Sequence, residues 1–119
     1  MRTIDEWKLS LRGALRDAMR ARDAAATVVL REVLGAFDNA EAVQAPATPM
    51  VTSGPIAGAV EGLGASEVPR RELVPEEAQQ LFEREVAARE AAAAEYNRLG
   101  RDASELRAQL AVLARISPK

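Results

Sequence analysis

The chain has 119 residues and a formal net charge of −2, and it contains no cysteine and no histidine. This composition excludes a disulfide-stabilised scaffold and the usual histidine and cysteine zinc sites. Aromatic residues make up only 3% of the chain, so a core has to come from aliphatic side chains and alanine. Such a core favours closely packed helices over sheets.

The first 43 residues predict two amphipathic helices. Thr3 and Glu6 have the spacing of a capping box, and the apolar residues that follow recur every three or four positions: Ile4, Trp7, Leu11, Ala14, Leu15 and Ala18. Asp23 interrupts the pattern and can cap a second helix, whose apolar face is Ala26, Val29, Leu30, Val33, Leu34 and Phe37. With almost no loop between them, the two helices either fold back as a hairpin or continue with a kink.

Residues 44–69 have a different composition. Four prolines alternate with four glycines in this stretch, and the periodic apolar pattern is lost. We therefore predict a flexible linker here.

The helical pattern returns over residues 70–119. Pro75 suits the first turn of a helix, and Gly100 suits its end. One side of this helix carries Ala78, Leu81, Phe82, Val86, Arg89, Ala93 and Tyr96. Asp102 with Glu105 predicts the cap of a fourth, shorter helix that presents Leu106, Leu110 and Leu113. The predicted fold is all-α: two helical hairpins (about four helices), residues 1–43 and 70–119, packed as a small bundle and separated by the flexible Pro/Gly linker.

Three stretches together resemble the YqeY-like family, whose domain also forms the tail of the GatB subunit of tRNA-dependent amidotransferases. The stretches read LRGALRDAMRARD, VVLREVLGAFDNAE and ELVPEEAQQLFEREVAAREAAAAEYNRLGR, and they cover about three quarters of the chain. The positions that match the family pattern are Ala18 to Asp23, Leu30 and Arg31, Asn39 to Glu41, and Gly100 and Arg101. Ala87 and Ala92 stand where family members commonly have lysine and serine.

The resemblance implies the amino-terminal helical domain of that family. Family proteins usually continue into a second helical domain, which we expect to be absent or truncated here. The resemblance also implies an association with tRNA or with the amidotransferase machinery, and it makes Arg31, Asn39, Glu41, Arg89 and Arg101 the family-type polar residues.

Two groups of arginines are candidate contacts for RNA or a protein partner. Arg12, Arg16 and Arg20 follow each other at four-residue spacing, opposite the apolar face of the first helix, where they could bind phosphates. Arg70 and Arg71 stand where the linker ends. We favour the alternative that both groups are solvated charges, because neither helical part has excess positive charge.

Other polar and aromatic residues suggest structural roles. Arg31, with Asn39 and Glu41, could form a polar patch for a partner or RNA. Arg31 lies near the core face of the second helix, however, so we favour its pairing with a carboxylate, and we expect an ion pair at Arg89 too. Asn39 and Glu41 are predicted to finish the second helix. Because aromatics are scarce, Trp7 and Tyr96 are both predicted to be core anchors rather than stacking platforms for bases.

Catalysis is not expected. Without cysteine or histidine, neither a Cys/His nor a Ser/His nucleophile pair can be built, and the glycines of the linker lack the lysine and helix of a phosphate-binding loop. We predict no cofactor and no metal.

The sequence thus predicts a cytoplasmic, non-catalytic, YqeY-like accessory or binding module, with no membrane association. One alternative is a helical scaffold or homo-oligomer with no RNA contact. Another is a component of a carbon–nitrogen ligase that uses glutamine as amido donor.

Overall fold

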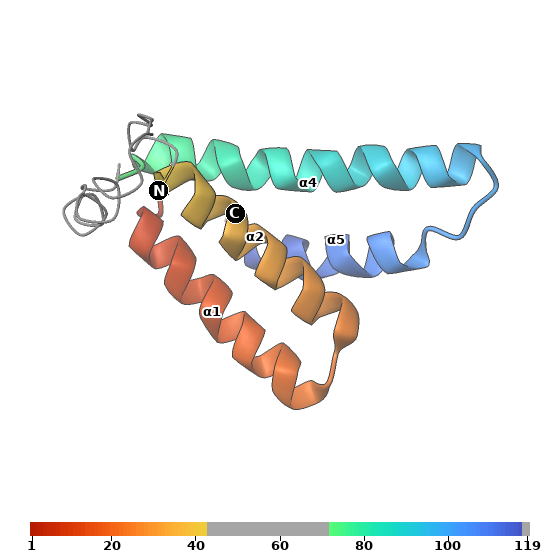
Figure 1. Ribbon diagram of the computed structural model, residues 1–119, viewed down its shortest axis with the longest axis horizontal. Coiled ribbons are helices and arrows are strands. Elements are labelled where there is room, and N and C mark those ends of the chain that lie inside the picture. Colours follow the sequence, from red (N-terminus) through yellow and green to blue (C-terminus); the bar gives the residue numbers. More distant parts are fainter. Residues whose placement is uncertain (43–71, 118–119) are drawn as a thin grey trace, which may run out of the picture.

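The computed structural model describes residues 1–42 and 72–117. Within these ranges 84% of the residues are helical and none is in a strand. The helices are α1 (Ile4–Ala21), α2 (Ala24–Ala42), α4 (Pro75–Arg98) and α5 (Ser104–Ile116), arranged as two hairpins (Figure 1). The all-α prediction is confirmed. The predicted linker and the pair Arg70 and Arg71 lie outside the described residues.

The capping box at the start of α1 forms as predicted. Glu6 N–H donates to Thr3 Oγ1 at 3.1 Å, and Thr3 N–H donates to Glu6 Oε1 at 2.8 Å. These two bonds satisfy backbone donors that have no partner within the helix.

The chain reverses direction between α1 and α2 within two residues. Arg22 adopts the left-handed conformation, with φ 57°, and its N–H donates to Met19 O at 3.2 Å, while Asp23 N–H donates to Ala18 O at 2.9 Å. This pair of bonds is a Schellman motif. Asp23 Oδ1 then accepts from Ala26 N–H at 3.1 Å and caps α2, so the hairpin forms and the kinked alternative is wrong.

A similar pair of backbone hydrogen bonds closes the turn of the second hairpin. Gly100 has φ 73°, its N–H donates to Asn97 O, and Arg101 N–H donates to Tyr96 O at 2.8 Å. After the turn, Asp102 Oδ1 accepts from both the N–H and the hydroxyl of Ser104, and these bonds hold the pKa of Asp102 below its usual value. The predicted pairing of Asp102 with Glu105 is therefore replaced by a contact with Ser104.

Trp7 is the centre of the core and is fully buried. Its ring stacks on Phe82 of α4 with centroids 4.6 Å apart, and it meets the edge of Phe37 of α2 at 6.0 Å. The guanidinium of Arg2 lies over the indole at 4.7 Å, and Arg2 Nη1 donates to Ile116 O at 2.7 Å. One side chain therefore joins three helices, and Arg2 connects it to the end of the fourth.

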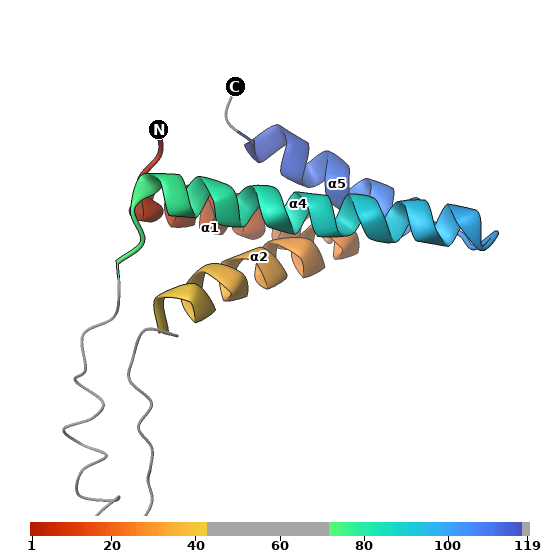
Figure 2. The same cartoon turned by 90° about the horizontal axis from the view of Figure 1, so that it is seen from above.

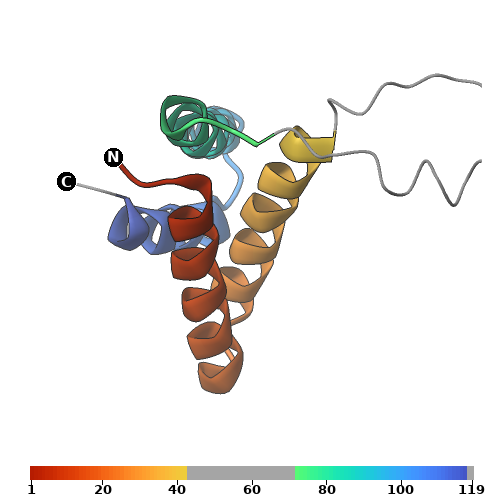
Figure 3. The ribbon, with the colours of Figure 1, turned by 90° about the vertical axis from the view of Figure 1, so that its left-hand side faces the viewer.

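The two hairpins cross, and the last turns of α4 extend beyond the α1–α2 hairpin (Figures 1 and 2). Figure 3 shows the start of α1 beside the end of α5, where Arg2 binds. Tyr96 belongs to the extended part of α4 and is 41% exposed, so its predicted role as a core anchor is wrong. The apolar pattern of α4 extends to Tyr96, but the first hairpin packs only against the earlier turns of this helix.

The two glycines Gly35 and Gly100 should respond oppositely to alanine. Gly35 lies inside α2 and a Cβ there would meet no atom within 4 Å, so Gly35→Ala should stabilise the protein by about 0.5–1 kcal/mol. Gly100→Ala should destabilise it by about 1 kcal/mol, because the turn needs a positive φ. Urea unfolding followed by Trp7 fluorescence measures both, and changes of the same sign would contradict the assigned backbone.

Candidate functional site

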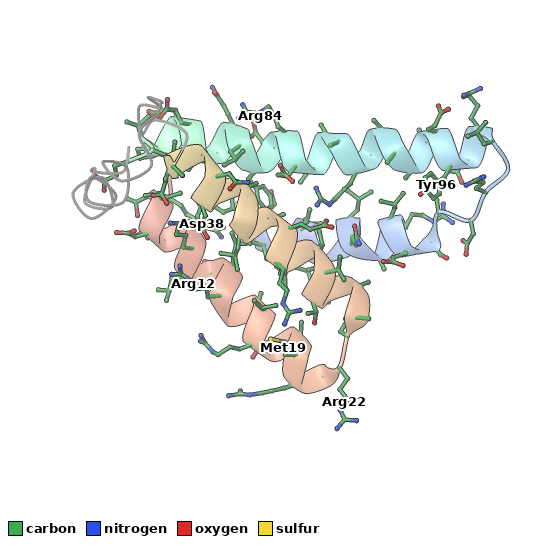
Figure 4. All side chains as sticks on the ribbon, in the orientation of Figure 1. Arg12, Met19, Arg22, Asp38, Arg84 and Tyr96 are labelled. Carbon is green, nitrogen blue, oxygen red and sulfur yellow. The ribbon has the colours of Figure 1, made fainter. Side chains whose placement is uncertain are left out.

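Four arginines of the first hairpin form the surface that we call the arginine surface: Arg12, Arg16, Arg20 and Arg31. All four side chains are exposed. The first three are one helical turn apart on the side of α1 that faces away from the core, and Figure 4 shows Arg12 on this outer side. None of the four makes an ion pair within the part of the chain that the structure describes.

Arg31 reaches across from α2 to α1. Its Nη2 donates weakly to Met19 Sδ at 4.0 Å, and Met19 is itself half exposed. The predicted carboxylate partner is therefore wrong for the described residues. The reason is geometric: Arg31 follows the buried Leu30 by one position, about 100° around the helix, which turns its side chain out of the interface.

The first hairpin is neutral by count, but its charges are separated. Residues 1–43 contain seven basic and seven acidic side chains. Five of the acids are held by groups outside the arginine surface: Glu6, Asp23, Glu32, Asp38 and Glu41. Three of these acids, Glu32, Asp38 and Glu41, are paired with Lys8 or Arg89 and not with the arginine surface.

Lys8 holds two of these acids at the other end of the hairpin. Its Nζ binds Glu41 directly and lies 3.2 Å from Asp38 Oδ1, and the Lys8 and Glu41 side chains are only 12% and 10% exposed. Burial disfavours the charged form of Lys8, but hydrogen bonds and attraction to both carboxylates outweigh it and raise its pKa. Asn39 beside them is exposed. Glu41 thus lies in the last turn of α2, where it was predicted, but it acts as the partner of a buried lysine.

Arg89 joins the two hairpins through an ion pair, as predicted. Its Nη2 lies 2.7 Å from Glu32 Oε1 of α2, and its Nη1 lies 2.9 Å from Glu85 Oε1 within α4. Nη1 also donates to Glu85 O at 2.9 Å. The side chain is 12% exposed, so this arginine is a structural group and unlike those of the arginine surface. Arg101, at the turn before α5, is exposed.

Sequence reasoning missed Lys8 as a partner and Met19 as a neighbour of Arg31. The signal for Lys8 was its place next to Trp7, at the edge of an apolar face, where a long aliphatic stem can be buried while its amine meets a carboxylate. Nothing in the sequence indicated the Met19 contact, because it depends on how closely α1 and α2 pack.

The residues that the structure describes contain no group of three acidic side chains placed to hold a metal ion. None of the helices within residues 1–42 and 72–117 is long and apolar enough to cross a membrane.

Removing the charge of Glu41 should cost more than removing that of Asp38. Glu41→Gln leaves the Lys8 ammonium buried without its main counter-charge, and it should lower the free energy of unfolding by about 1–3 kcal/mol. Asp38→Asn removes a half-exposed partner and should cost less than about 1 kcal/mol. Urea unfolding of the two variants tests this order, and equal effects would contradict the burial of the pair.

The raised pKa of Lys8 predicts an alkaline loss of stability. Its contribution is complete below the ordinary lysine pKa of 10.5 and is lost as the pH rises through the higher value of the folded protein. The double variant Lys8→Met/Glu41→Leu removes both charges and should lose this pH dependence. Urea midpoints at about pH 8 and about pH 11 measure the difference, and an unchanged dependence in the double variant would refute the assignment.

Comparisons with protein-family models, with curated proteins and with solved structures found no match to this chain. The candidate site therefore depends on the residues themselves and on their arrangement. Among these residues, the arginine surface is a group of four exposed arginines on one hairpin whose charges are not used in an ion pair within the described residues.

Proposed function

We propose that this chain is a non-catalytic, YqeY-like helical binding module that contacts the phosphate backbone of RNA, with tRNA as the first candidate. The resemblance of the sequence to the YqeY-like family supports the choice of tRNA. The arginine surface supports a polyanionic partner.

The observation that carries the proposal is the contrast between two kinds of basic side chain. Lys8 and Arg89 are mostly buried and are paired with carboxylates from another helix or another hairpin. The four arginines of the arginine surface are exposed and have no carboxylate partner within the described residues. Their charge is available to a ligand without breaking an ion pair, and the one side-chain hydrogen bond that they make among residues 1–42 and 72–117 is the weak bond from Arg31 to Met19.

The spacing of the arginine surface suits a repeating anion. Successive arginines on α1 are four residues apart, which is about 6 Å along a helix. A guanidinium binds a phosphate through two parallel hydrogen bonds, and such contacts position a protein on a nucleic acid without reading its sequence. Three or four contacts of this kind give modest, salt-sensitive binding.

The environment of Lys8 supports a binding role for the protein rather than an enzymatic role. Lys8 is the only lysine in the described residues, and a Ser–Lys mechanism would need its amine free and deprotonated. Its amine is instead engaged by Glu41 and Asp38, which raise its pKa. This favours a structural role for Lys8, which in the absence of histidine was the best candidate for a catalytic base.

Substitution of the arginine surface should weaken RNA binding in a site-specific way. Arg12→Ala and Arg16→Ala should each lower the affinity for tRNA about three- to tenfold at about 0.1 M salt and reduce the salt slope by about one. Fluorescence anisotropy with labelled tRNA measures both quantities.

Arg84→Ala is the matched control. Arg84 is an exposed arginine on α4 of the second hairpin, at the upper edge of the molecule in Figure 4, whereas Arg12 lies on α1. Its loss should therefore leave the affinity within about twofold of the unchanged protein. Equal weakening by all three substitutions, or tRNA binding that does not respond to salt, would reject the proposed surface.

A further inference from the structure

The structure contains a groove between the first hairpin and the end of α5. Its volume is about 330 Å³. Small side chains leave space in this groove: Ala18 and Ala21 of α1, and Ala26 of α2. Larger apolar side chains, Leu30 and Ile116, also line it. The groove exists because small residues line the tip of the first hairpin where it passes α5.

The groove is charged as well as apolar. Asp17 and Asp23 line it from the first hairpin, and Arg115 lines it from α5. Asp23 is engaged in capping α2, whereas Asp17 makes no ion pair within the described residues. On the side of the first hairpin, the two carboxylates favour an occupant that brings a cation next to an apolar group, whereas Arg115 on the α5 side carries the opposite charge.

The turn between α4 and α5 presents exposed apolar side chains next to a cation, which complement the apolar lining and the carboxylates of the groove. Leu99 is 56% exposed and Tyr96 is 41% exposed, although the backbone of the turn is fixed by the Schellman bonds around Gly100. Arg101 follows directly, is exposed, and makes no ion pair within the described ranges. The turn lies at the far end of α4, beyond the first hairpin (Figures 1 and 2).

We propose that the α4–α5 turn of one copy of this chain docks into the groove of a second copy. Leu99 enters the apolar groove, and Arg101 lies against Asp17. Two such contacts related by a two-fold axis close into a dimer. The groove accepts few side chains, so the contact is small and the dimer weak, with a dissociation constant between about 1 μM and about 1 mM.

The test is sedimentation velocity of RNA-free protein from about 0.1 μM to about 1 mM. The unchanged chain should shift from monomer to dimer over this range. Leu99→Asp and Asp17→Arg should each weaken the association at least about tenfold, because each removes one half of the contact. The double variant Asp17→Arg/Arg101→Asp restores opposite charges and should recover most of the affinity.

Folding is checked by Trp7 fluorescence and far-ultraviolet circular dichroism, which these exposed substitutions should leave unchanged. A chain that stays monomeric at all concentrations overturns the proposal, and so does a dimer that is insensitive to Leu99→Asp and Asp17→Arg. Failure of the double variant to recover association also overturns the pairing of Arg101 with Asp17. Because the protein is free of RNA, none of these results bears on tRNA binding.

Discussion

The packing of Trp7 against Phe37 and Phe82 is the interaction on which the rest of the structure depends. It joins α1, α2 and α4 at one point, and Arg2 connects the same ring to the end of α5. Truncating a buried tryptophan costs about 3–5 kcal/mol, which is much of the stability of a small domain. The indole therefore lies where the two hairpins meet, within a core made, apart from these three aromatic rings, of leucine, valine, isoleucine and alanine side chains.

Polar pairing around this core determines which charges remain for a ligand. Glu41 and Asp38 hold Lys8, and Glu32 holds Arg89. These pairs engage three carboxylates of α2 and use none of the four arginines of the arginine surface. Those arginines have no carboxylate partner within the described residues.

Much of the fold could be predicted from the sequence, because it depends on local rules. The capping box of Thr3, the break at Asp23 and the turn at Gly100 each follow from the chemistry of one or two residues. The wrong predictions needed tertiary information. Tyr96 continues the apolar pattern of α4 but lies beyond the cover of the first hairpin, and Arg31 faces Met19 rather than a carboxylate. The groove beside α5 depends on how the hairpins cross, which no spacing in the sequence encodes.

The central claim is that exposed, unpaired arginines on one side of the first hairpin are the contact for RNA. It is tested most directly by following the arginine side-chain Nε–Hε signals by NMR as tRNA is added. The account predicts that Arg12, Arg16, Arg20 and Arg31 shift together at low salt, while the buried Arg89 and the distant Arg84 stay in place. Shifts spread evenly over all exposed arginines, or confined to α4, would contradict it.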